Sequence, residues 1–396
     1  MELILPDYVL YTLKNLNNNG YLAYLVGGCV RDYLMGIEPN DFDIATNAKP
    51  DEVVKLFDKV IETGIRHGTV TVLFDKNKVE VTTFRTEGEY INFRRPKEVL
   101  FINSLYEDLK RRDFTINAMA YNPTEGIIDY FEGQKDIEKK IIRTVGDPKE
   151  RFIEDALRIL RCIRFATKFN FSIEERTYNA LIEKCNLLDF ISRERIVDEL
   201  KKIINDKNAL IGLDLLNKTK IGQKITTYYE HIYNKIKNTQ FIDIEKDYRL
   251  ASFFSLLINK DLILSEMNKL KLDNDNKKKA ITLSALLINQ DEDEIIKRTY
   301  FSFGYYESSK IIKAVAILKN KHEIYERFIK LYKSNKLISK DNLKINGEIL
   351  VKLGFRGRQI GKILENITDL ILHEKLSNSE KEIIKYVNEK FKKGKK

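Results

Sequence analysis

Two aspartates separated by a single residue follow a pair of glycines near the start of the chain. The glycines are Gly27 and Gly28, and the aspartates Asp41 and Asp43 flank Phe42. Alternate side chains of a strand share a face, so we expect both carboxylates on one side. Such charges repel each other unless a cation lies between them, and paired carboxylates suit Mg²⁺, which keeps substrate phosphates among its ligands. Glycines at a helix start let backbone N–H groups approach a phosphate. The pattern indicates metal-assisted nucleotidyl transfer.

A mixed α/β unit is predicted to position these residues. The apolar segment 21–26 is typical of a strand that runs into the glycines, and residues 29–35 are predicted to form the helix that follows. Further strands are expected at 41–46, 69–74 and 78–84. Beyond about Gly146, strand patterns become rare and amphipathic helical patterns dominate, which predicts an all-helical remainder.

The composition points to an anionic partner. The 396 residues carry a formal net charge of +10, and the pI is about 9.1. Nucleic acid is the first candidate because Lys and Arg neutralise its phosphates, although nucleotide bias in the coding sequence is an alternative source of the lysines. Three widely separated cysteines indicate a reducing compartment. No leader pattern or membrane-spanning apolar run is recognised, so we expect a cytoplasmic protein.

Three further motifs follow the first block in a fixed order. They occupy residues 87–96, 107–120 and 154–166, and the last carries arginines at three-residue intervals. The ordered set closely resembles the class II tRNA nucleotidyltransferases, the bacterial CCA-adding enzymes and their poly(A) polymerase relatives. The resemblance is dense over residues 1–200 and resumes at 345–378, which is similar to the tail of the CCA-adding type.

The resemblance implies a fold of the α+β class. The head would be a palm-like mixed sheet with helices, of the polymerase-beta type, and an all-α neck, body and tail would follow it. The expected domains are the catalytic head at 1–143, the neck with a nucleotide-templating helix at 144–205, the body at 206–335 and the tRNA-binding tail at 336–396.

The resemblance also implies an activity. CMP and AMP would be transferred from CTP and ATP to the 3′ end of tRNA without a nucleic-acid template, with Mg²⁺ as cofactor, release of pyrophosphate, and neither DNA nor a membrane as partner. A CC-adding or A-adding specialist and a poly(A) polymerase are alternatives within the same class. A non-catalytic RNA-binding protein is the alternative from another class, and the intact Asp41 and Asp43 argue against it.

Within this family, Asp41 and Asp43 would hold the metal ions, which bridge the attacking and leaving oxygens of an in-line displacement. Glu80 is the candidate third carboxylate, because it stands between Val79 and Val81, where an unpaired charge is costly. An exposed glutamate on an edge strand is the alternative interpretation of Glu80.

The triphosphate would be bound by Gly28 through its backbone and by the guanidinium groups of Arg31 and Arg112. A salt bridge from Arg31 to Asp32 or Asp41 is the alternative for that arginine. Asp113 could accept hydrogen bonds from the ribose hydroxyls.

A helix is predicted over 154–164, with Ile153, Leu157, Leu160 and Phe165 facing a core. Asp155 and Arg158 would read the base, because cytosine and adenine present an amino donor beside a ring-nitrogen acceptor, whereas uracil and guanine present a carbonyl beside a ring N–H. An ion pair between these two residues, three apart on one helix, is the alternative. Arg161 and Arg164 would join the nucleotide site, although on an ideal helix Arg164 lies roughly opposite Asp155.

Three other features are less specific. Residues 87–101 are predicted to form a mobile loop, which in CCA-adding enzymes is needed to add A. His67 is expected to have a structural role. Glycines in 346–371 are compatible with phosphate contact or with tight helix packing.

Overall fold

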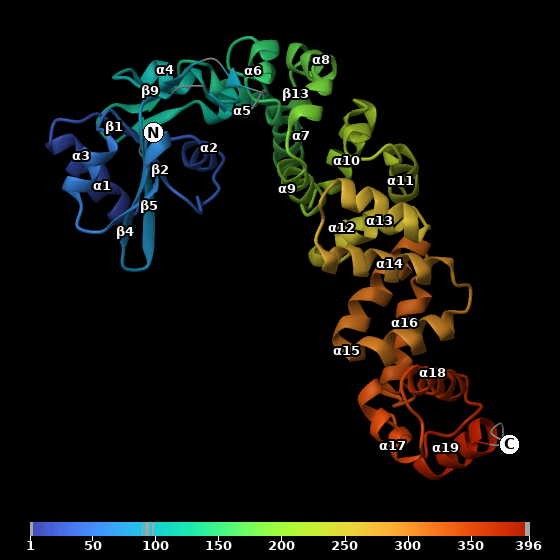
Figure 1. Cartoon of the computed structure of the whole chain (residues 1–396). Coiled ribbons are helices and arrows are strands. Elements are labelled where there is room, and N and C mark those ends of the chain that lie inside the picture. Colours follow the sequence, from blue (N-terminus) through green and yellow to red (C-terminus); the bar gives the residue numbers. More distant parts are fainter. Residues whose placement is uncertain (1–2, 89, 92–94, 97–98, 393–396) are drawn as a thin grey trace. The chain divides into compact units, whose positions relative to one another are not determined.

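The computed structural model describes residues 3–88, 90–91, 95–96 and 99–392. The chain divides into two units, residues 1–230 and residues 231–396. Strands are concentrated in the first part of the first unit, and helices make up most of the remaining described chain (Figure 1). The predicted α+β head and all-α remainder are therefore confirmed.

A mixed sheet forms the centre of the head. Over the described residues it has seven strands, in the order β11-β10-β1-β2-β5-β4-β3. Neighbouring strands are antiparallel except β2 and β5, which run parallel in the middle of the sheet. The strands are β1 (Ala23–Val26), β2 (Asp43–Thr46), β3 (Val60–Gly64), β4 (Thr69–Phe74), β5 (Asn77–Thr83), β10 (Ala120–Asn122) and β11 (Gly126–Ile128).

The strand pattern read from the sequence is closely reproduced. β4 coincides with the predicted segment 69–74, and β5 lies one residue before the predicted segment 78–84. Val79 and Val81 of β5 are buried, whereas Glu80 between them is exposed. Alternation of this kind places one face of a strand on the core and the other toward solvent.

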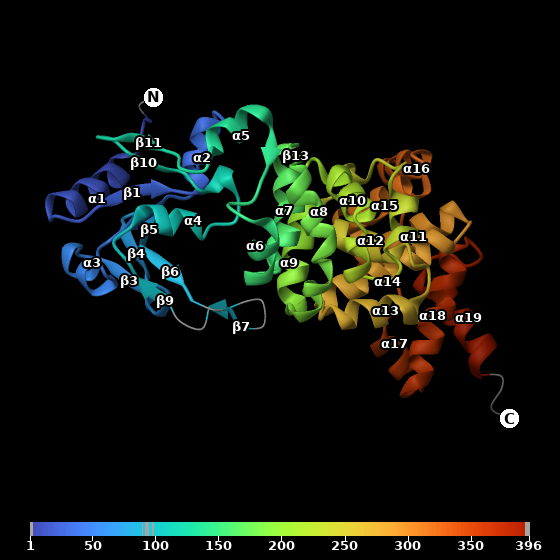
Figure 2. The same ribbon diagram turned by 90° about the horizontal axis from the view of Figure 1, so that it is seen from above.

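Helices cover both faces of the sheet; Figure 2 gives a second view of them. Leu13 and Val81 belong to the core under α1, α2 and α3, and Phe84 and Leu109 belong to the core under α4. Removing each of these side chains from water contributes about 1.5–3 kcal/mol to stability. The head helices are α1 (Asp7–Asn18), α2 (Gly28–Leu34), α3 (Pro50–Leu56), α4 (Leu105–Lys110) and α5 (Gly133–Lys139).

The turn from β1 into α2 requires a glycine. Gly27 has a φ of 76°, in the left-handed region that side chains disfavour. A Cβ atom at Gly27 would also come within 2.8 Å of an Arg112 guanidinium nitrogen. The first glycine of the motif therefore lets Arg112 approach the start of α2.

The neck starts with two helices where the sequence predicted one. α6 (Pro148–Glu154) is separated from α7 (Leu157–Phe169) because Asp155 has extended backbone angles, with φ −134° and ψ 102°. The prediction of one helix over 154–164 is therefore wrong at its start. The predicted core residues on α7 are buried, but Ile153 of α6 is exposed.

Two more helices complete the neck, α8 (Glu175–Glu183) and α9 (Arg193–Ile204), and α10 (Ala209–Lys218) follows in the segment expected to begin the body. Both α9 and α10 pack against α7. A short parallel pair, β12 (Ile141–Ile142) with β13 (Ser172–Ile173), connects the end of the head to the neck.

Two short antiparallel ladders occupy the segment predicted as a loop over 87–101. β6 (Arg85–Glu87) pairs with β9 (Val99–Phe101), and β7 (Tyr90–Ile91) pairs with β8 (Arg95–Pro96). Strand pairing thus replaces irregular loop structure at these positions. Asn92, Phe93 and Arg94, which belong to the same motif, lie outside the described residues.

The second unit is built from helices in its described residues. Leu350, Ile367 and Ile383 belong to a separate core at its C-terminal end. α15 is interrupted at Gly304, whose φ of 68° and ψ of −170° are not helical. Among the described residues, no helix combines the length and apolar character needed to cross a membrane. The helices are α11 (Tyr229–Ile236), α12 (Lys246–Ser255), α13 (Lys260–Lys269), α14 (Asn274–Ile288), α15 (Glu292–Lys319), α16 (Glu323–Lys333), α17 (Gly347–Lys352), α18 (Arg358–Leu372) and α19 (Glu380–Val387).

Candidate active site

The first unit contains a cavity of about 940 Å³ lined by both the head and the neck. Every residue predicted for the site lines it except Glu80. Its described lining has many more cationic than anionic side chains, which suits a ligand with several negative charges. The lining residues are Gly27, Gly28, Arg31, Asp41, Asp43, His67, Arg85, Val99, Arg111, Arg112, Asp113, Asn117, Asp155, Arg158, Arg161, Arg164, Phe165, Lys168 and Arg195.

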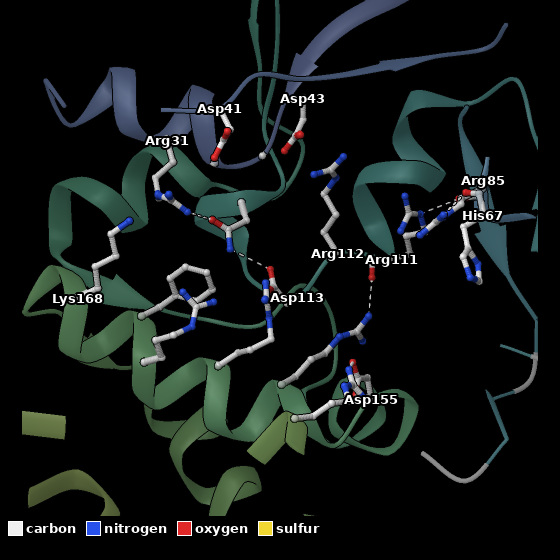
Figure 3. A pocket seen from close by; sticks show the side chains of 18 of the residues that line it. Arg31, Asp41, Asp43, His67, Arg85, Arg111, Arg112, Asp113, Asp155 and Lys168 are labelled. Atoms are coloured by element: carbon white, nitrogen blue, oxygen red, sulfur yellow. Dashed lines mark hydrogen bonds and ion pairs between the residues drawn. The ribbon is translucent and has the colours of Figure 1, made fainter. Parts of the chain in front are cut away.

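Asp41 and Asp43 project from the head into this cavity (Figure 3). Both are exposed while Phe42 between them is buried, so the predicted alternation is confirmed, although β2 begins only at Asp43. Within the described part of the chain, neither carboxylate forms a hydrogen bond or an ion pair. They are therefore available to an incoming ligand or cation.

The electrostatics of Asp43 favour a cation beside it. Desolvation by the surrounding walls, together with Glu80 and Asp41, raises the pKa of Asp43, and Arg112 opposes this only in part. A cation between the carboxylates would relieve their repulsion. Over the described ranges, no three His, Cys, Asp or Glu side chains are grouped to hold a metal ion, so other oxygens would have to complete its coordination.

Glu80 stands in register with Asp43 in the parallel pairing of β2 with β5. Because β5 lies between β2 and β4, the alternative of an edge-strand position is wrong. The side chain is exposed, as that alternative expected, and it does not line the cavity. Its role as a third carboxylate stays a prediction.

Arg31 lies at the cavity with its guanidinium held on several sides. It forms an ion pair of 2.7 Å with Asp32, which confirms the salt-bridge alternative, and it also donates to the side-chain oxygen of Asn117. The guanidinium carbon lies 4.7 Å from the ring centroid of Phe169 and 5.5 Å from that of Phe165. The salt bridge and a place in the cavity therefore coexist, and these contacts fix the orientation of the guanidinium.

Asp108 precedes Arg111 and Arg112 in the motif at 107–120, and it is 1% exposed. It pairs with Arg111 at 2.7 Å and with Arg112 at 3.3 Å. Burial alone would raise the pKa of Asp108, but Arg112 and Arg111 bring it below its ordinary value. This buried carboxylate holds both arginines at the cavity wall.

Asp113 is almost completely buried and accepts four hydrogen bonds. One oxygen accepts from the backbone N–H of Phe114 and from the Asn117 amide, and the other accepts from two nitrogens of Arg161. Burial would raise the pKa of Asp113, but Arg161 and Asn117 lower it to about 2. The contact with ribose stays a prediction, and the carboxylate already has a structural role in orienting Arg161.

Asp155 and Arg158 both line the cavity, but they do not pair with each other. Asp155 accepts from Arg195 of α9 at 3.0 and 3.4 Å. Arg158 pairs with Glu154 at 2.6 Å and donates to the carbonyl of Arg111. The simple ion pair three residues apart is therefore wrong, because Asp155 lies in the break between two helices.

Arg161 and Arg164 face the cavity together. Arg161 is tied to Asp113, and Arg164 forms an ion pair of 2.6 Å with the buried Glu199 of α9. The expectation that Arg164 lies opposite Asp155 is wrong, since the ideal-helix argument does not apply across the break at Asp155. Both residues line the cavity, and their part in a nucleotide site stays a prediction.

Sequence reasoning missed several lining residues. Lys168 follows Arg164 by four positions, and this helical spacing was the signal that could have found it. Arg195 reaches the cavity through the packing of α9 on α7, which no local pattern reveals. His67, expected to be structural, lines the cavity, and its backbone carbonyl accepts a hydrogen bond from Arg85.

Family models match most of this architecture. Residues 23–143 match the poly A polymerase head domain, and residues 243–387 match tRNA nucleotidyltransferase domain 2. Residues 170–227 match a model described as "Probable RNA and SrmB- binding site of polymerase A".

Whole-chain relatives agree with these models. The CCA-adding enzyme of Bacillus subtilis is 36% identical over 94% of this chain and 95% of its own, and that of Staphylococcus aureus is 36% identical over 95% of this chain and 96% of its own. A crystal structure of the Bacillus stearothermophilus CCA-adding enzyme in complex with CTP has a TM-score of 0.83 and 29% identity, and the match covers 99% of each chain. The chain belongs to the tRNA nucleotidyltransferase family that includes these CCA-adding enzymes.

Proposed function

We propose that this chain builds or repairs the 3′-terminal CCA of tRNA from CTP and ATP, with release of pyrophosphate. The single observation that carries the proposal is the cavity in which two free carboxylates of the head face a set of arginines on the neck. Family membership with the CCA-adding enzymes supports the same reaction. We propose the cytoplasm as the location of this reaction, because tRNA, CTP and ATP are present together there.

Mg²⁺ is the proposed metal, and Asp41 and Asp43 are its proposed ligands. Their carboxylates have no other partner among the described residues, and burial, followed by the charges of Glu80 and Asp41, raises the pKa of Asp43, so the donor set fits a hard divalent cation. When bound, such a metal polarises phosphoryl oxygens and activates the attacking hydroxyl. Glu80 is proposed to add negative charge behind Asp43 rather than to enter the cavity.

The head supplies the proposed phosphate contacts. Gly28 offers its backbone at the start of α2, and Arg31 and Arg112 present guanidiniums that Asp32 and Asp108 keep in place. Guanidinium groups match phosphate oxygens in pairs and stabilise charge that grows on the departing pyrophosphate. These contacts are the same for CTP and ATP.

The neck supplies the proposed base recognition. Asp155 would accept from the amino group of cytosine or adenine, and Arg158 would donate to the adjacent ring nitrogen. The opposite pattern on uracil and guanine leaves these groups unpaired. Arg161 and Arg164 complete the proposed nucleotide site. Asp113 orients Arg161 through their ion pair and is also proposed to accept hydrogen bonds from the ribose.

The proposed domain boundaries correspond to these proposed roles of the head and the neck. The head spans 1–143, the neck 144–205, the body 206–335 and the tail 336–396, and the last is proposed to bind tRNA. Complete CCA addition is preferred over a CC-adding or A-adding specialist because the segment 87–101 is present.

One assay tests the proposal. The protein is incubated with tRNA that lacks its CCA end, with CTP, ATP or both, and the 3′ ends are sequenced. We expect C-C-A with both nucleotides, C-C with CTP alone and no addition with UTP. Addition of a single nucleotide type, or an untemplated run of A, would assign the chain to one of the alternative activities.

A further inference from the structure

Lys168 is a cationic residue of the cavity without an assigned role. It stands in the last turn of α7, seven residues after Arg161 and four after Arg164, a spacing that puts the three side chains on one face of the helix. Among the described residues its ammonium group has no hydrogen bond or ion pair. It lies 5.1 Å from the ring centroid of Phe169.

Three neighbouring arginines differ from Lys168 in this respect. Arg31, Arg161 and Arg164 are each paired with a carboxylate, so the charge of each guanidinium is largely compensated before a ligand arrives. Burial lowers the pKa of Lys168, and Arg31 and Arg164 lower it further, although Asp32 and Asp206 oppose them. A bound anion would therefore stabilise the charged ammonium more than solvent does in the empty cavity.

The position of Lys168 indicates which part of a nucleotide it meets. The base-reading pair lies at the start of α7, and Lys168 follows Arg158 by ten residues, about 15 Å along a helix. Arg31 packs on Phe169, next to Lys168, and the close-up shows Lys168 on the side of Arg31 and away from Asp155 (Figure 3). A nucleotide that reaches from one end of this face to the other has its phosphates at Lys168.

We propose that Lys168 binds the terminal phosphates of the incoming CTP or ATP, together with Arg31. The proposal rests on the proposed function, because it assigns one end of the same nucleotide. An ammonium group supplies up to three donors without a fixed geometry, so it can follow pyrophosphate as that group departs. A phosphate of the tRNA 3′ strand has the same chemistry, and the experiment below distinguishes it from the phosphates of the nucleotide.

The experiment compares three variants of the full chain. Lys168→Gln removes the charge, Lys168→Arg keeps it, and Lys207→Gln removes an exposed lysine of the same region that does not line the cavity. Equilibrium binding of CTP, ATP, CMP and tRNA lacking CCA is measured for each by titration. These readouts do not require turnover.

Loss of one charge-assisted contact is expected to weaken CTP and ATP binding about tenfold in Lys168→Gln. CMP and tRNA affinity should stay unchanged, Lys168→Arg should bind CTP nearly as well as the wild type, and Lys207→Gln should match the wild type for CTP. Unchanged CTP affinity in Lys168→Gln, or equal weakening of CMP, would overturn the proposal. Weaker tRNA binding with normal CTP binding would also overturn it and would assign Lys168 to the RNA strand.

The experiment distinguishes a failure of the proposed function from a failure of the phosphate site at Lys168. If the wild type adds no CCA while CTP binding still depends on Lys168 and CMP binding does not, the reaction is wrong and the phosphate site stands. If the wild type adds CCA while Lys168→Gln binds CTP normally, the reaction stands and the phosphate site is refuted.

Discussion

Arg195 holds Asp155 by two hydrogen bonds, of 3.0 and 3.4 Å, across the gap between α9 and the end of α6. Asp155 lies where the backbone is extended, so helical geometry does not orient its carboxylate. The backbone N–H of Leu157 provides the only other hydrogen bond recorded for this carboxylate among the described residues. Arg195 is therefore a positioning residue for the proposed base-reading carboxylate.

Replacing Arg195 is expected to loosen base choice. In Arg195→Met the carboxylate of Asp155 loses its side-chain partner, and discrimination of CTP over UTP should fall by about three- to tenfold, the net worth of one ordinary hydrogen bond, because the effect on the base is indirect. Misincorporation is measured by sequencing the 3′ ends. Arg176→Met is the control, because the Arg176 side chain is 74% exposed and its ion pair, within the described part of the chain, is with the surface residue Asp147. Equal misincorporation in both variants would contradict a positioning role.

Direct removal of the base-reading groups should have a larger effect. Asp155→Ala and Arg158→Ala are each expected to lower discrimination against UTP and GTP by about one to two orders of magnitude, because a mismatched edge leaves polar groups unpaired at about 1–3 kcal/mol each. Melting temperatures are measured on the same proteins. A depressed melting temperature with unchanged base choice would show that both residues only brace the neck.

Loss of either carboxylate that faces the cavity should stop the reaction. Asp41→Asn and Asp43→Asn are expected to abolish addition of both C and A and to spare tRNA binding, since only the proposed metal ligands change. The measurement is nucleotide addition together with a tRNA binding titration. Asp75→Asn, an exposed residue in the turn after β4, is the matched control and should be fully active. More than a few per cent of activity in both active-site variants would exclude the metal assignment.

The buried pair of Asp113 and Arg161 should make stability depend on pH. The pKa of Asp113 is lowered to about 2 in the folded chain, below its unfolded value of about 4, so its contribution is present above about pH 4 and is lost as the pH falls toward 2. Asp113→Asn should then cost on the order of 2 kcal/mol at neutral pH. Melting of both proteins is followed by circular dichroism.

The difference between wild type and Asp113→Asn should shrink as the pH falls through this range. A difference that stays constant from neutral pH to about pH 2 would mean that the lost packing, and not the charge of Asp113, explains the change.

The segment that carries β7 and β8, between β6 and β9, should be needed for adding A but not for adding C. Replacing residues 90–96 by two glycines leaves the pairing of β6 with β9 in place. We expect C-C addition to continue and A addition to be lost, in line with the resemblance to the loop of CCA-adding enzymes. Products with CTP alone and with both nucleotides are sequenced. Equal loss of both steps would indicate a general structural role.

Local patterns in the sequence predicted much of the head. The alternation of Val79, Glu80 and Val81 fixed the position of β5, and the aspartates around Phe42 were correctly placed on one side. The break at Asp155 escaped prediction because the residues on both of its sides have helical patterns. At the break, Asp155 accepts hydrogen bonds from the backbone N–H of Leu157 and from Arg195, forty positions away, and a contact at that distance leaves no periodic signal.

The same limit applies to the candidate site. Motif residues on the head and on α7 were found, because their types and spacing are unusual. Arg195 was not, since its place at the cavity depends on how α9 packs on α7. Lys168 was overlooked although it follows Arg164 at helical spacing. Arg158 pairs with Glu154 rather than Asp155, at a spacing of four residues that the sequence also allowed.

The parallel pairing of β2 with β5 has a kinetic consequence. Parallel neighbours cannot be joined by a tight turn, and the intervening chain, residues 47–76, carries α3, β3 and β4. Pairings between residues far apart in sequence form slowly, because the closure of the loop costs entropy before any contact forms. We therefore expect Asp43 and Glu80 to meet late, after the elements between them have assembled. In that order of events, the two carboxylates come into register only when the centre of the sheet is complete.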